Sequence, residues 1–251
     1  MLKIILSGCS GKMGGVITDI VSQDDNAQIV AGVDPFFKDG LKYPVHPTFN
    51  ELPVADVIID FSNPAALDNI LEYATKNSVA FVAATTGYTD EQIEKIKAAA
   101  KKIPVFFTFN MSIGINLLTT LVKRAASVLG SGFDIEIIEK HHNQKIDAPS
   151  GTAIMLASAI NETLDNKMIY EYDRHSKREK RSQNEIGIHS VRGGTIVGEH
   201  EVIFAGNNEV LSLTHQAFSK SVFAAGAVRA AKFLKDKAPG LYDMNDLISE
   251  K

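Results

Sequence analysis

Leu2-Lys3-Ile4-Ile5-Leu6-Ser7-Gly8-Cys9-Ser10-Gly11-Lys12-Met13-Gly14 is the stretch that decides the fold. Its apolar run ends at a glycine turn, and Val16 to Val21 can continue the chain as a helix. A strand, a glycine turn and a helix in this order are the context of a dinucleotide-binding motif, because glycine lets the backbone approach a pyrophosphate and the helix N-terminus attracts its charge. Since any tight turn can use glycine, the motif predicts a nicotinamide or flavin dinucleotide only together with this context.

Asp34 stands at the end of a second expected strand, Ala27 to Val33, where an acid can accept hydrogen bonds from the ribose hydroxyls of the cofactor. The alternative is that Asp34, before Pro35, only begins a turn. Its carboxylate favours NADH because it would repel the extra phosphate of NADPH, whereas the ammonium of Lys12 could meet that phosphate. We therefore expect both cofactors to be used. Cys9 is interpreted as a small residue of the turn, since no histidine is near it in the sequence to activate its thiol.

Strands and helices alternate over the first 110 residues. Further strands are expected at 54–60, 78–83 and 104–108, and amphipathic helices at 65–76 and 90–101. Buried-type strands that alternate with helices predict an α/β fold with a Rossmann-like, doubly wound parallel sheet. Ligands of such sheets bind beyond the carboxyl ends of the strands, so the loops Ala84-Thr85-Thr86-Gly87 and Thr108-Phe109-Asn110-Met111-Ser112 should line the nicotinamide end of the site. Thr85 and Thr86 could instead only cap the next helix.

The pattern changes after Asn110. A helix at 114–129 precedes the alternating run 134–139, and further strands are expected at 185–192, 195–205 and 209–215, the last two joined by a hairpin at Gly206-Asn207-Asn208. These elements predict a second α+β domain, built on a mixed or antiparallel sheet, at 111–218. The helix at 223–234 could return to the first domain, which comprises 1–110 and 219–251. The segment 174–184 has charges of both signs and no apolar residue, so it is interpreted as a solvated loop.

The densest chemistry lies in Glu139-Lys140-His141-His142-Asn143-Gln144-Lys145-Ile146-Asp147-Ala148-Pro149-Ser150-Gly151-Thr152-Ala153, between an expected strand and an expected helix at 153–164. His141 or His142 can exchange protons near neutral pH, and Lys145 supplies a positive charge and a possible acid. The amides of Ser150, Gly151 and Thr152 at a helix start, with the Thr152 hydroxyl, can bind a carboxylate. Metal binding is the competing interpretation, but adjacent histidines on a strand point apart and no third ligand stands at zinc-like spacing, so no metal is expected.

Composition limits the classes of function. The chain has 251 residues, of which 45% are hydrophobic, and its net charge of −4 gives no reason to expect nucleic acid. The single cysteine excludes an internal disulfide, and no run approaches the roughly 18 apolar residues of a membrane span. We expect a cytoplasmic protein that acts on a small molecule, with neither a membrane nor a nucleic acid as partner.

The run from Glu139 to Ala153 resembles the signature of the 4-hydroxy-tetrahydrodipicolinate reductase (dihydrodipicolinate reductase) family, in which paired histidines and a lysine precede Asp-Ala-Pro-Ser-Gly-Thr. The resemblance extends over nearly the whole chain. It includes the turn from Gly8 to Gly14 and the segments Asp60-Phe61-Ser62, Thr85-Thr86-Gly87, Asn110-Met111-Ser112-Ile113-Gly114-Ile115-Asn116, Val191-Arg192-Gly193-Gly194, Gly198-Glu199-His200 and Gly226-Ala227-Val228-Arg229-Ala230-Ala231.

This resemblance implies a role for individual residues. Cofactor contacts are implied for Gly8, Cys9, Ser10, Gly11, Lys12, Met13, Asp34, Ala84, Thr85, Thr86, Thr108, Phe109, Asn110 and Met111. His141 is implied as proton donor or acceptor and Lys145 as proton donor. The substrate carboxylates are implied to lie against His142, Gly151 and Thr152, and we expect Ser150 beside them.

The reaction that the resemblance implies is the reduction, by NADH or NADPH, of the cyclic imine acid formed from pyruvate and aspartate semialdehyde. Tetrahydrodipicolinate forms with loss of water, in lysine biosynthesis by the diaminopimelate pathway. A homotetramer joined through sheets of the second domain is also implied. One departure from the pattern is Pro35, where some relatives carry a basic residue after the ribose-binding acid; Lys38 stands further on. This departure argues against a preference for NADPH.

Two other functions compete with this one. Another two-domain dehydrogenase of amino acids or aldehyde acids would share the glycine turn but not the paired histidines. A regulatory protein that binds NADH as a redox signal would have no need of the array from Lys145 to Thr152.

Overall fold

The computed structural model describes residues 1–37 and 40–250, so Lys38 lies outside the described residues. The chain divides into two compact units, Met1–Ile113 with Lys220–Lys251, and Gly114–Ser219. The domain boundaries expected from the sequence lie within a few residues of these junctions. Within 1–37 and 40–250, no helix is long and apolar enough to cross a membrane.

The first unit is built on a seven-stranded sheet in the order β12-β6-β5-β4-β1-β2-β3. Every neighbouring pair is parallel. The strands are β1 (Leu2–Ser7), β2 (Ala27–Val33), β3 (Val45–His46), β4 (Val57–Asp60), β5 (Ala80–Ala83), β6 (Pro104–Phe107) and β12 (Gly240–Tyr242). The strand order reverses between β1 and β4, which is where doubly wound sheets bind ligands. The prediction of a Rossmann-like parallel sheet is therefore confirmed.

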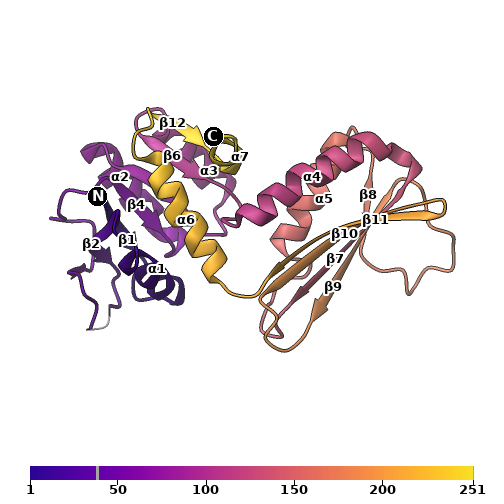
Figure 1. Cartoon of the computed structure of the whole chain (residues 1–251), viewed down its shortest axis with the longest axis horizontal. Helices are drawn as coiled ribbons and strands as arrows, with labels where there is room; N and C mark the ends of the chain where they lie inside the picture. Colours follow the sequence, from indigo (N-terminus) through magenta and orange to yellow (C-terminus); the bar gives the residue numbers. More distant parts are fainter. Residues whose placement is uncertain (38–39, 251) are drawn as a thin grey trace. The chain divides into compact units, whose positions relative to one another are not determined.

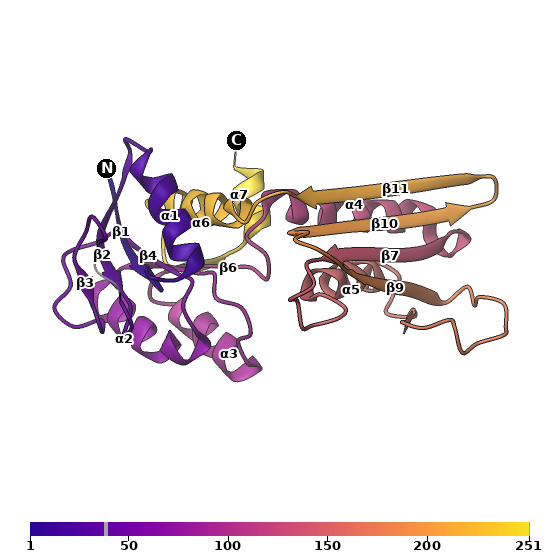
Figure 2. The same cartoon turned by 90° about the horizontal axis from the view of Figure 1, so that it is seen from below.

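Helices cover both faces of this sheet (Figure 1, Figure 2). On one face lie α1 (Lys12–Ser22), α6 (Ser221–Leu234) and α7 (Met244–Ser249), and on the other lie α2 (Leu67–Asn77), preceded by the 3-10 helix η1 (Pro64–Ala66), and α3 (Asp90–Ala99). Because the central strands β4 and β5 face helices on both sides, all their residues are buried and the apolar residues do not alternate with exposed polar ones. Phe81 and Phe106 are fully buried in opposite layers, and burial of each such side chain stabilises the fold by about 1.5–3 kcal/mol.

The second unit has a five-stranded mixed sheet in the order β11-β10-β7-β9-β8. The strands β7 (Asp134–His141), β9 (Glu185–Arg192) and β8 (Ile169–Glu171) are parallel neighbours, whereas β10 (Gly198–Gly206) runs antiparallel to β7 and forms the expected hairpin with β11 (Glu209–Ala217). The helices α4 (Ile113–Leu129), which continues into the 3-10 helix η2 (Gly130–Gly132), and α5 (Gly151–Thr163) cover one face (Figure 1).

Alternation along β7 decides which side chains meet these helices. Ile135, Ile137, Glu139 and His141 are buried, and the residues between them are half-buried. Because successive side chains of a strand point to opposite faces, these four lie on the face that α4 and α5 cover. An acid and a histidine therefore share a buried face with two isoleucines.

Some short elements of the described residues were not predicted, namely β3, β8, β12, α7 and η2. The three strands have only two or three residues and lie at sheet edges, so none is long enough to show a hydrophobic pattern. Several predicted strands start later or end earlier in the structure: β5 begins at Ala80 rather than Ser78, and β6 ends at Phe107 rather than Thr108. Val54 is exposed and β4 begins only at Val57, and the strand expected from Thr195 begins at Gly198.

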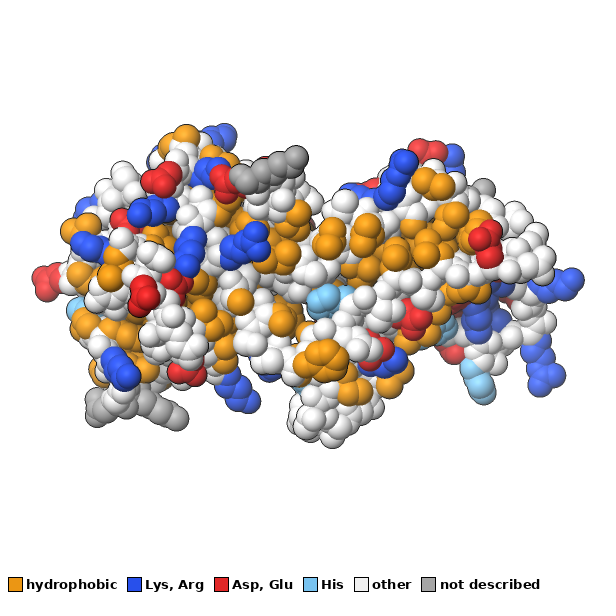
Figure 3. Space-filling view, in the orientation of Figure 1, with side chains coloured by type: hydrophobic (Ala, Val, Ile, Leu, Met, Phe, Trp, Pro, Cys, Tyr) orange, Lys and Arg blue, Asp and Glu red, His pale blue; other side chains and the backbone are white. Residues whose placement is uncertain are grey.

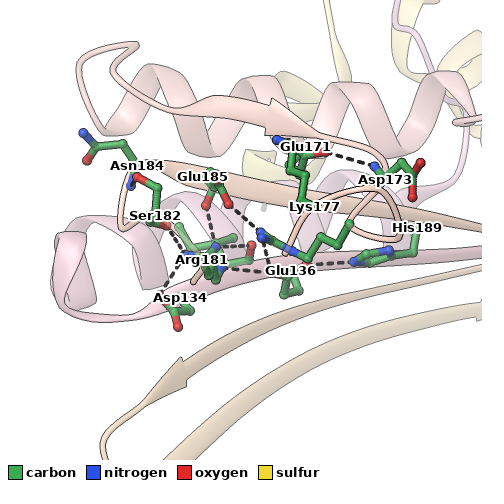
Figure 4. Close-up of polar contacts among 12 residues, drawn as sticks. Asp134, Glu136, Glu171, Asp173, Lys177, Arg181, Ser182, Asn184, Glu185 and His189 are labelled. Carbon is green, nitrogen blue, oxygen red and sulfur yellow. Dashed lines mark hydrogen bonds and ion pairs between the residues drawn. The ribbon is translucent and has the colours of Figure 1, made fainter. Parts of the chain in front are cut away.

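The interpretation of 174–184 as a solvated loop is wrong for Arg181. Its side chain is only 16% exposed and lies against β7, where it donates to Glu136 at 3.0 Å and to Asp134 at 2.8 Å (Figure 4). Further ion pairs of the segment are Arg174 with Glu185 and Lys177 with Glu171. A segment without apolar residues is thus held by charges, because its cations meet carboxylates outside the segment.

Candidate active site

The glycine turn lies between the end of β1 and the start of α1. Gly8 has a φ of +76°, a left-handed conformation that favours glycine, and its amide donates to the carbonyl oxygen of Val33 at 2.9 Å. A Cβ atom at Gly14 would lie 2.4 Å from the carbonyl oxygen of Cys9 and 2.5 Å from that of Gly8. The turn can close onto the helix in this way only with glycine at position 14.

The N-terminus of α1 can attract an anion. Its N-cap residue, Gly11, makes no side-chain cap hydrogen bond, and the first turn contains no acidic residue. The first amides of a helix have no partner within it, and the helix dipole adds a partial positive charge there. Together with the close backbone turn, these features fit the pyrophosphate of a dinucleotide.

Asp34 follows β2 directly and borders the turn. One of its carboxylate oxygens accepts a hydrogen bond from the amide of Ser10 at 3.1 Å, and the other accepts from the amide of Phe36 at 3.0 Å. Each carboxylate oxygen can accept a second bond, so ribose hydroxyls can bind here. Lys12 is exposed on the same turn. Cys9 is buried, and burial raises the pKa of its thiol, which keeps it protonated and unreactive.

Asp60, the last residue of β4, is a fully buried acid that ties two loops together. One carboxylate oxygen accepts from the amide of Ser62 at 3.1 Å and its hydroxyl at 2.5 Å, and the other accepts from the hydroxyls of Thr85 at 2.7 Å and Tyr88 at 3.1 Å. Burial, followed by the charge of Asp60, raises the pKa of Tyr88. The loop after β5 is therefore fixed to the loop after β4.

The loop after β6 is fixed from the other side by α6. A Cβ atom at Gly226 would lie 1.8 Å from the carbonyl oxygen of Met111, so this helix can approach the loop only with glycine there. Within the loop, the side chain of Asn110 accepts from the amide of Ser112 at 2.8 Å. Thr108 is half-buried and Phe109 is exposed.

The fourteen residues expected to contact the cofactor all follow the carboxyl ends of β1, β2, β5 and β6. Because the strands are parallel neighbours of one sheet, these ends share one edge. Ala84 and Thr85 are buried there and Thr86 is exposed. The structure thus brings the predicted cofactor residues together at one edge of the first unit.

In the second unit, the fully buried Glu139 organises the end of β7. Arg192 forms a bidentate ion pair with it, both N···O distances being 2.7 Å, and the amide of Ser150 donates to it at 3.1 Å. Its second oxygen lies 2.6 Å from Nδ1 of His141. Burial raises the pKa of Glu139, but the hydrogen bonds, above all from Arg192 and His141, outweigh it and lower the pKa to about 2.

His141 is 8% exposed and has two ionisable neighbours besides Glu139 and Arg192. Its ring meets that of His200 edge to face, with the centroids 5.1 Å apart. Burial lowers the pKa of His141, and the hydrogen bond and charge of Glu139 oppose this only in part; the charge of Lys145 lowers it further. Burial also lowers the pKa of His200 to about 3, so His200 is neutral at neutral pH, and its Nε2 lies 3.0 Å from the hydroxyl of Ser150.

The turn after β7 carries the two remaining polar candidates. The Nζ atom of Lys145 lies 2.8 Å from a carboxylate oxygen of Asp147, and its backbone amide donates to the carbonyl oxygen of His142 at 3.1 Å. Nδ1 of His142 is buried and has no hydrogen-bond partner among the described residues. Although burial raises the pKa of Asp147, its contacts with Lys145 lower it overall.

The N-terminus of α5 begins at Ser150, whose hydroxyl accepts from the amide of Ala153 at 3.2 Å. Gly151 is exposed and Thr152 half-buried in the first turn, which contains no acidic residue. The amide of Ser150 donates to Glu139, and so does His141, which means that the histidine and this helix start share one carboxylate. A proton-exchanging ring thus lies near a helix end suited to a carboxylate. In the part of the chain that the structure describes, no three His, Cys, Asp or Glu side chains group as a metal site.

Both units match models of one protein family. Residues 2–111 match the dihydrodipicolinate reductase N-terminus, and residues 114–248 match the dihydrodipicolinate reductase C-terminus. The chain belongs to the dihydrodipicolinate reductase family. The resemblance inferred from the loop between Glu139 and Ala153 is confirmed.

Similar members of this family cover the chain from end to end. This chain is 50% identical to a 4-hydroxy-tetrahydrodipicolinate reductase of Clostridium novyi (strain NT), over 100% of each chain. It is 51% identical to the same enzyme of Caldanaerobacter subterraneus subsp. tengcongensis, over 100% of this chain and 99% of the other. A dipicolinate-bound dihydrodipicolinate reductase from Paenisporosarcina sp. TG-14 has 27% identity and a TM-score of 0.80, covering 98% of this chain and 99% of that one.

Three residues near the dihydrodipicolinate reductase signature were given no role by the sequence reasoning: the buried Glu139 and His200 and the half-buried Arg192. A signal was present for Glu139, because an acid two positions before His141 in an alternating strand must share the buried face. Arg192 and His200 lie in segments that carry the family resemblance, but no local pattern assigns them to the site, since they reach it from β9 and β10, which pair with β7.

Proposed function

We propose that this chain reduces 4-hydroxy-tetrahydrodipicolinate to tetrahydrodipicolinate with NADH or NADPH and loss of water, in lysine biosynthesis by the diaminopimelate pathway. The observation that carries the proposal is the shared carboxylate of Glu139, which joins the buried His141 to the N-terminus of α5. A glycine turn alone would fit any dinucleotide enzyme. A dicarboxylate reductase requires a group that binds a substrate carboxylate and a group beside it that exchanges a proton. The N-terminus of α5 and the ring of His141 can supply these two groups.

A nicotinamide dinucleotide, when bound, supplies the hydride. The turn from Gly8 to Met13 and the N-terminus of α1 would hold its pyrophosphate, and Asp34 would accept hydrogen bonds from its adenosine ribose. The loops that contain Ala84 to Thr86 and Thr108 to Met111 would flank the nicotinamide. Asp34 disfavours the extra phosphate of NADPH while the exposed Lys12 can meet it, so we expect turnover with both cofactors.

The second unit would hold the substrate by its carboxylates. The amides of Gly151 and Thr152, the side chain of His142 and the ammonium of Lys145 are the proposed donors. Ser150, which we expected beside them, directs its amide to Glu139 and its hydroxyl to α5 and His200. In the proposed site it therefore caps the helix rather than holding the substrate.

His141 and Lys145 would handle protons. Water leaves first, with the hydroxyl from C4 and a proton from C5, so that a C4=C5 double bond is conjugated with the ring imine. Hydride addition at C4 then pushes negative charge into this conjugated system, and a proton from one of these two side chains neutralises it. General acid catalysis of this kind contributes about 10²–10⁴-fold. We therefore expect His141→Ala and Lys145→Ala each to lower kcat by about 10²–10⁴-fold while the Kd of NADH stays near that of the unchanged protein.

Steady-state kinetics test the proposal. NADH and NADPH oxidation would be followed with freshly condensed pyruvate and aspartate semialdehyde, with a planar pyridine dicarboxylate as competitive inhibitor. Consumption that depends on both condensation partners supports the assignment. If neither NADH nor NADPH is consumed, the result favours another dehydrogenase of the same two-domain plan. Normal turnover in both variants would contradict the assignment of His141 and Lys145 as proton donors.

We also propose that the chain forms a homotetramer through the sheet of the second unit. Helices cover only one face of that sheet, and the strand alternation puts the exposed Val191 and Val210 on the other. Hydrophobic side chains also reach the surface of this unit over α4 (Figure 3). Light scattering on the purified protein tests the subunit number; a monomer at micromolar concentration would contradict the proposal.

A further inference from the structure

Both carboxylate oxygens of Glu139 accept hydrogen bonds. Glu139 is 0% exposed, and its partners are the two Nη groups of Arg192, the amide of Ser150, the ring of His141 and the side chain of Ser190. A buried carboxylate is strongly disfavoured unless its oxygens are hydrogen-bonded and its charge is paired. Its contacts here meet both conditions, so Glu139 is held ionised in one orientation.

An ionised Glu139 determines which nitrogen of His141 carries a proton. A carboxylate can only accept, so Nδ1, 2.6 Å away, must be the donor. In the neutral ring Nε2 then has the lone pair, and in the protonated ring Nε2 has the proton that can leave. A Cβ atom at Gly198 would lie 3.2 Å from Nε2, so glycine at that position leaves this edge of the ring uncrowded.

We propose that Glu139 is a positioning residue, held by Arg192, that fixes the ring orientation and the tautomer of His141 so that Nε2 exchanges the proton during reduction. The inference deepens the proposed function and rests on the role assigned there to His141. Arg192 also donates to the carbonyl oxygen of Asp147 at 2.6 Å. It thereby connects Glu139 to the turn that carries Lys145, the second proposed proton donor.

The charged and titratable groups around His141 come from several elements. Glu139 lies on the same strand, Lys145 in the following turn, Arg192 on β9, and the neutral His200 on β10. Among them only Glu139 favours the protonated ring. Loss of its charge should therefore move the histidine limb of the pH profile of kcat/KM to lower pH.

Glu139→Gln is the informative variant because it replaces one carboxylate oxygen by an NH₂ group. If the remaining oxygen faces Nη2 of Arg192 and the amide of Ser150, the new NH₂ group faces Nδ1 of His141, which must then accept. The same NH₂ group also faces Nη1 of Arg192, so the hydrogen bond from Nη1 is lost. The tautomer reverses and Nε2 becomes the protonated nitrogen of the neutral ring. Glu136→Gln is the matched control, because Glu136 also lies on β7 and pairs with an arginine, Arg181, but its side chain is on the opposite face.

The test combines ¹⁵N NMR of the histidine rings with kinetics of the full chain. We expect His141 to be the Nδ1–H tautomer in the unchanged protein and the Nε2–H tautomer in Glu139→Gln. The kcat of that variant should fall about 10²–10⁴-fold, as for other misplaced general acids and bases. Its KM for NADH should be unchanged, and Glu136→Gln should keep its kcat and its pH profile.

Two results would overturn the inference. One is an Nε2–H tautomer of His141 in the unchanged protein, a measurement that needs no variant to fold. The other is a folded Glu139→Gln protein with unchanged kcat and pH profile. If the unchanged protein has the Nδ1–H tautomer but oxidises no NADH with the condensed substrate, the proposed function fails while the positioning by Glu139 stands.

Discussion

Replacement of Gly14 by alanine tests whether the glycine turn is the cofactor site. The added Cβ would lie 2.4 Å from the carbonyl oxygen of Cys9 and 2.5 Å from that of Gly8, both backbone atoms that no side-chain rotation can move away. To reach ordinary van der Waals contact at 3.4 Å, the turn must open by about 1 Å. Overpacking of this kind costs about 1–3 kcal/mol.

If that cost falls on the conformation that binds the cofactor, the Kd of NADH rises about 5–150-fold. Isothermal titration calorimetry with NADH measures this directly. Gly15→Ala is the control, because a Cβ at the neighbouring helical position would meet nothing within 4 Å. Alanine there should leave the Kd unchanged and raise the Tm slightly, since it favours the helix by about 0.5–1 kcal/mol. A folded Gly14→Ala protein with the Kd of the unchanged chain would refute the reasoning.

Three further changes follow from buried charges. Asp60→Asn places an amide among donors, so we expect a lower Tm and a higher KM for NADH; an unchanged KM would mean that the loops it joins do not shape the cofactor site. Arg181→Ala should lower the free energy of unfolding by about 1.5–3 kcal/mol in urea, whereas Arg178→Ala, at an exposed position, should have no effect; equal effects would contradict the anchoring role. The pKa of Glu139 is lowered from 4.5 to about 2, so its contribution to stability is complete above pH 4.5 and is lost as the pH falls toward 2. Urea unfolding of Glu139→Gln should therefore depend less on pH in that range than unfolding of the unchanged protein; parallel curves would contradict the lowered pKa.

The local parts of the site could be predicted because their signals lie within a few residues of one another. The turn from Gly8 to Gly14 joins a strand to a helix, and the sheet order then brings Asp34 and the later loops to the same edge. The loop from Glu139 to Ala153 carries its own proton donors and helix start. In both segments the pattern of neighbours predicted the geometry before any tertiary contact was known.

The ion pair of Glu139 and the hydrogen bonds of Asp60 could not be predicted, because their partners are far apart in the sequence. Arg192 reaches Glu139 only because β9 pairs with β7 in a register that sets His141 opposite Arg192. Asp60 meets Thr85 because β4 and β5 pair so that Asp60 lies opposite Ala83. Registers of this kind depend on packing across the sheet, and a single sequence does not specify them.

The position of Arg181 could not be predicted either, because the acids that bind it are distant in the sequence. Its neighbours in the sequence are polar and charged, which is typical of a solvated segment. Its side chain is nevertheless enclosed, because β7 presents Asp134 and Glu136 where the segment passes. The charge pattern of the segment was visible, but the acids that it meets lie more than forty residues away.

We propose that hydride passes from C4 of a bound nicotinamide to ring carbon C4 of a cyclic imine dicarboxylate. Incubation with NADH that carries two deuterium atoms at C4, followed by mass spectrometry and NMR of the product, tests this most directly. The account predicts that the unchanged protein forms tetrahydrodipicolinate with one deuterium on ring carbon C4. The amount of this product formed by His141→Ala should be much lower. A product without deuterium at C4, or no tetrahydrodipicolinate at all, would contradict it.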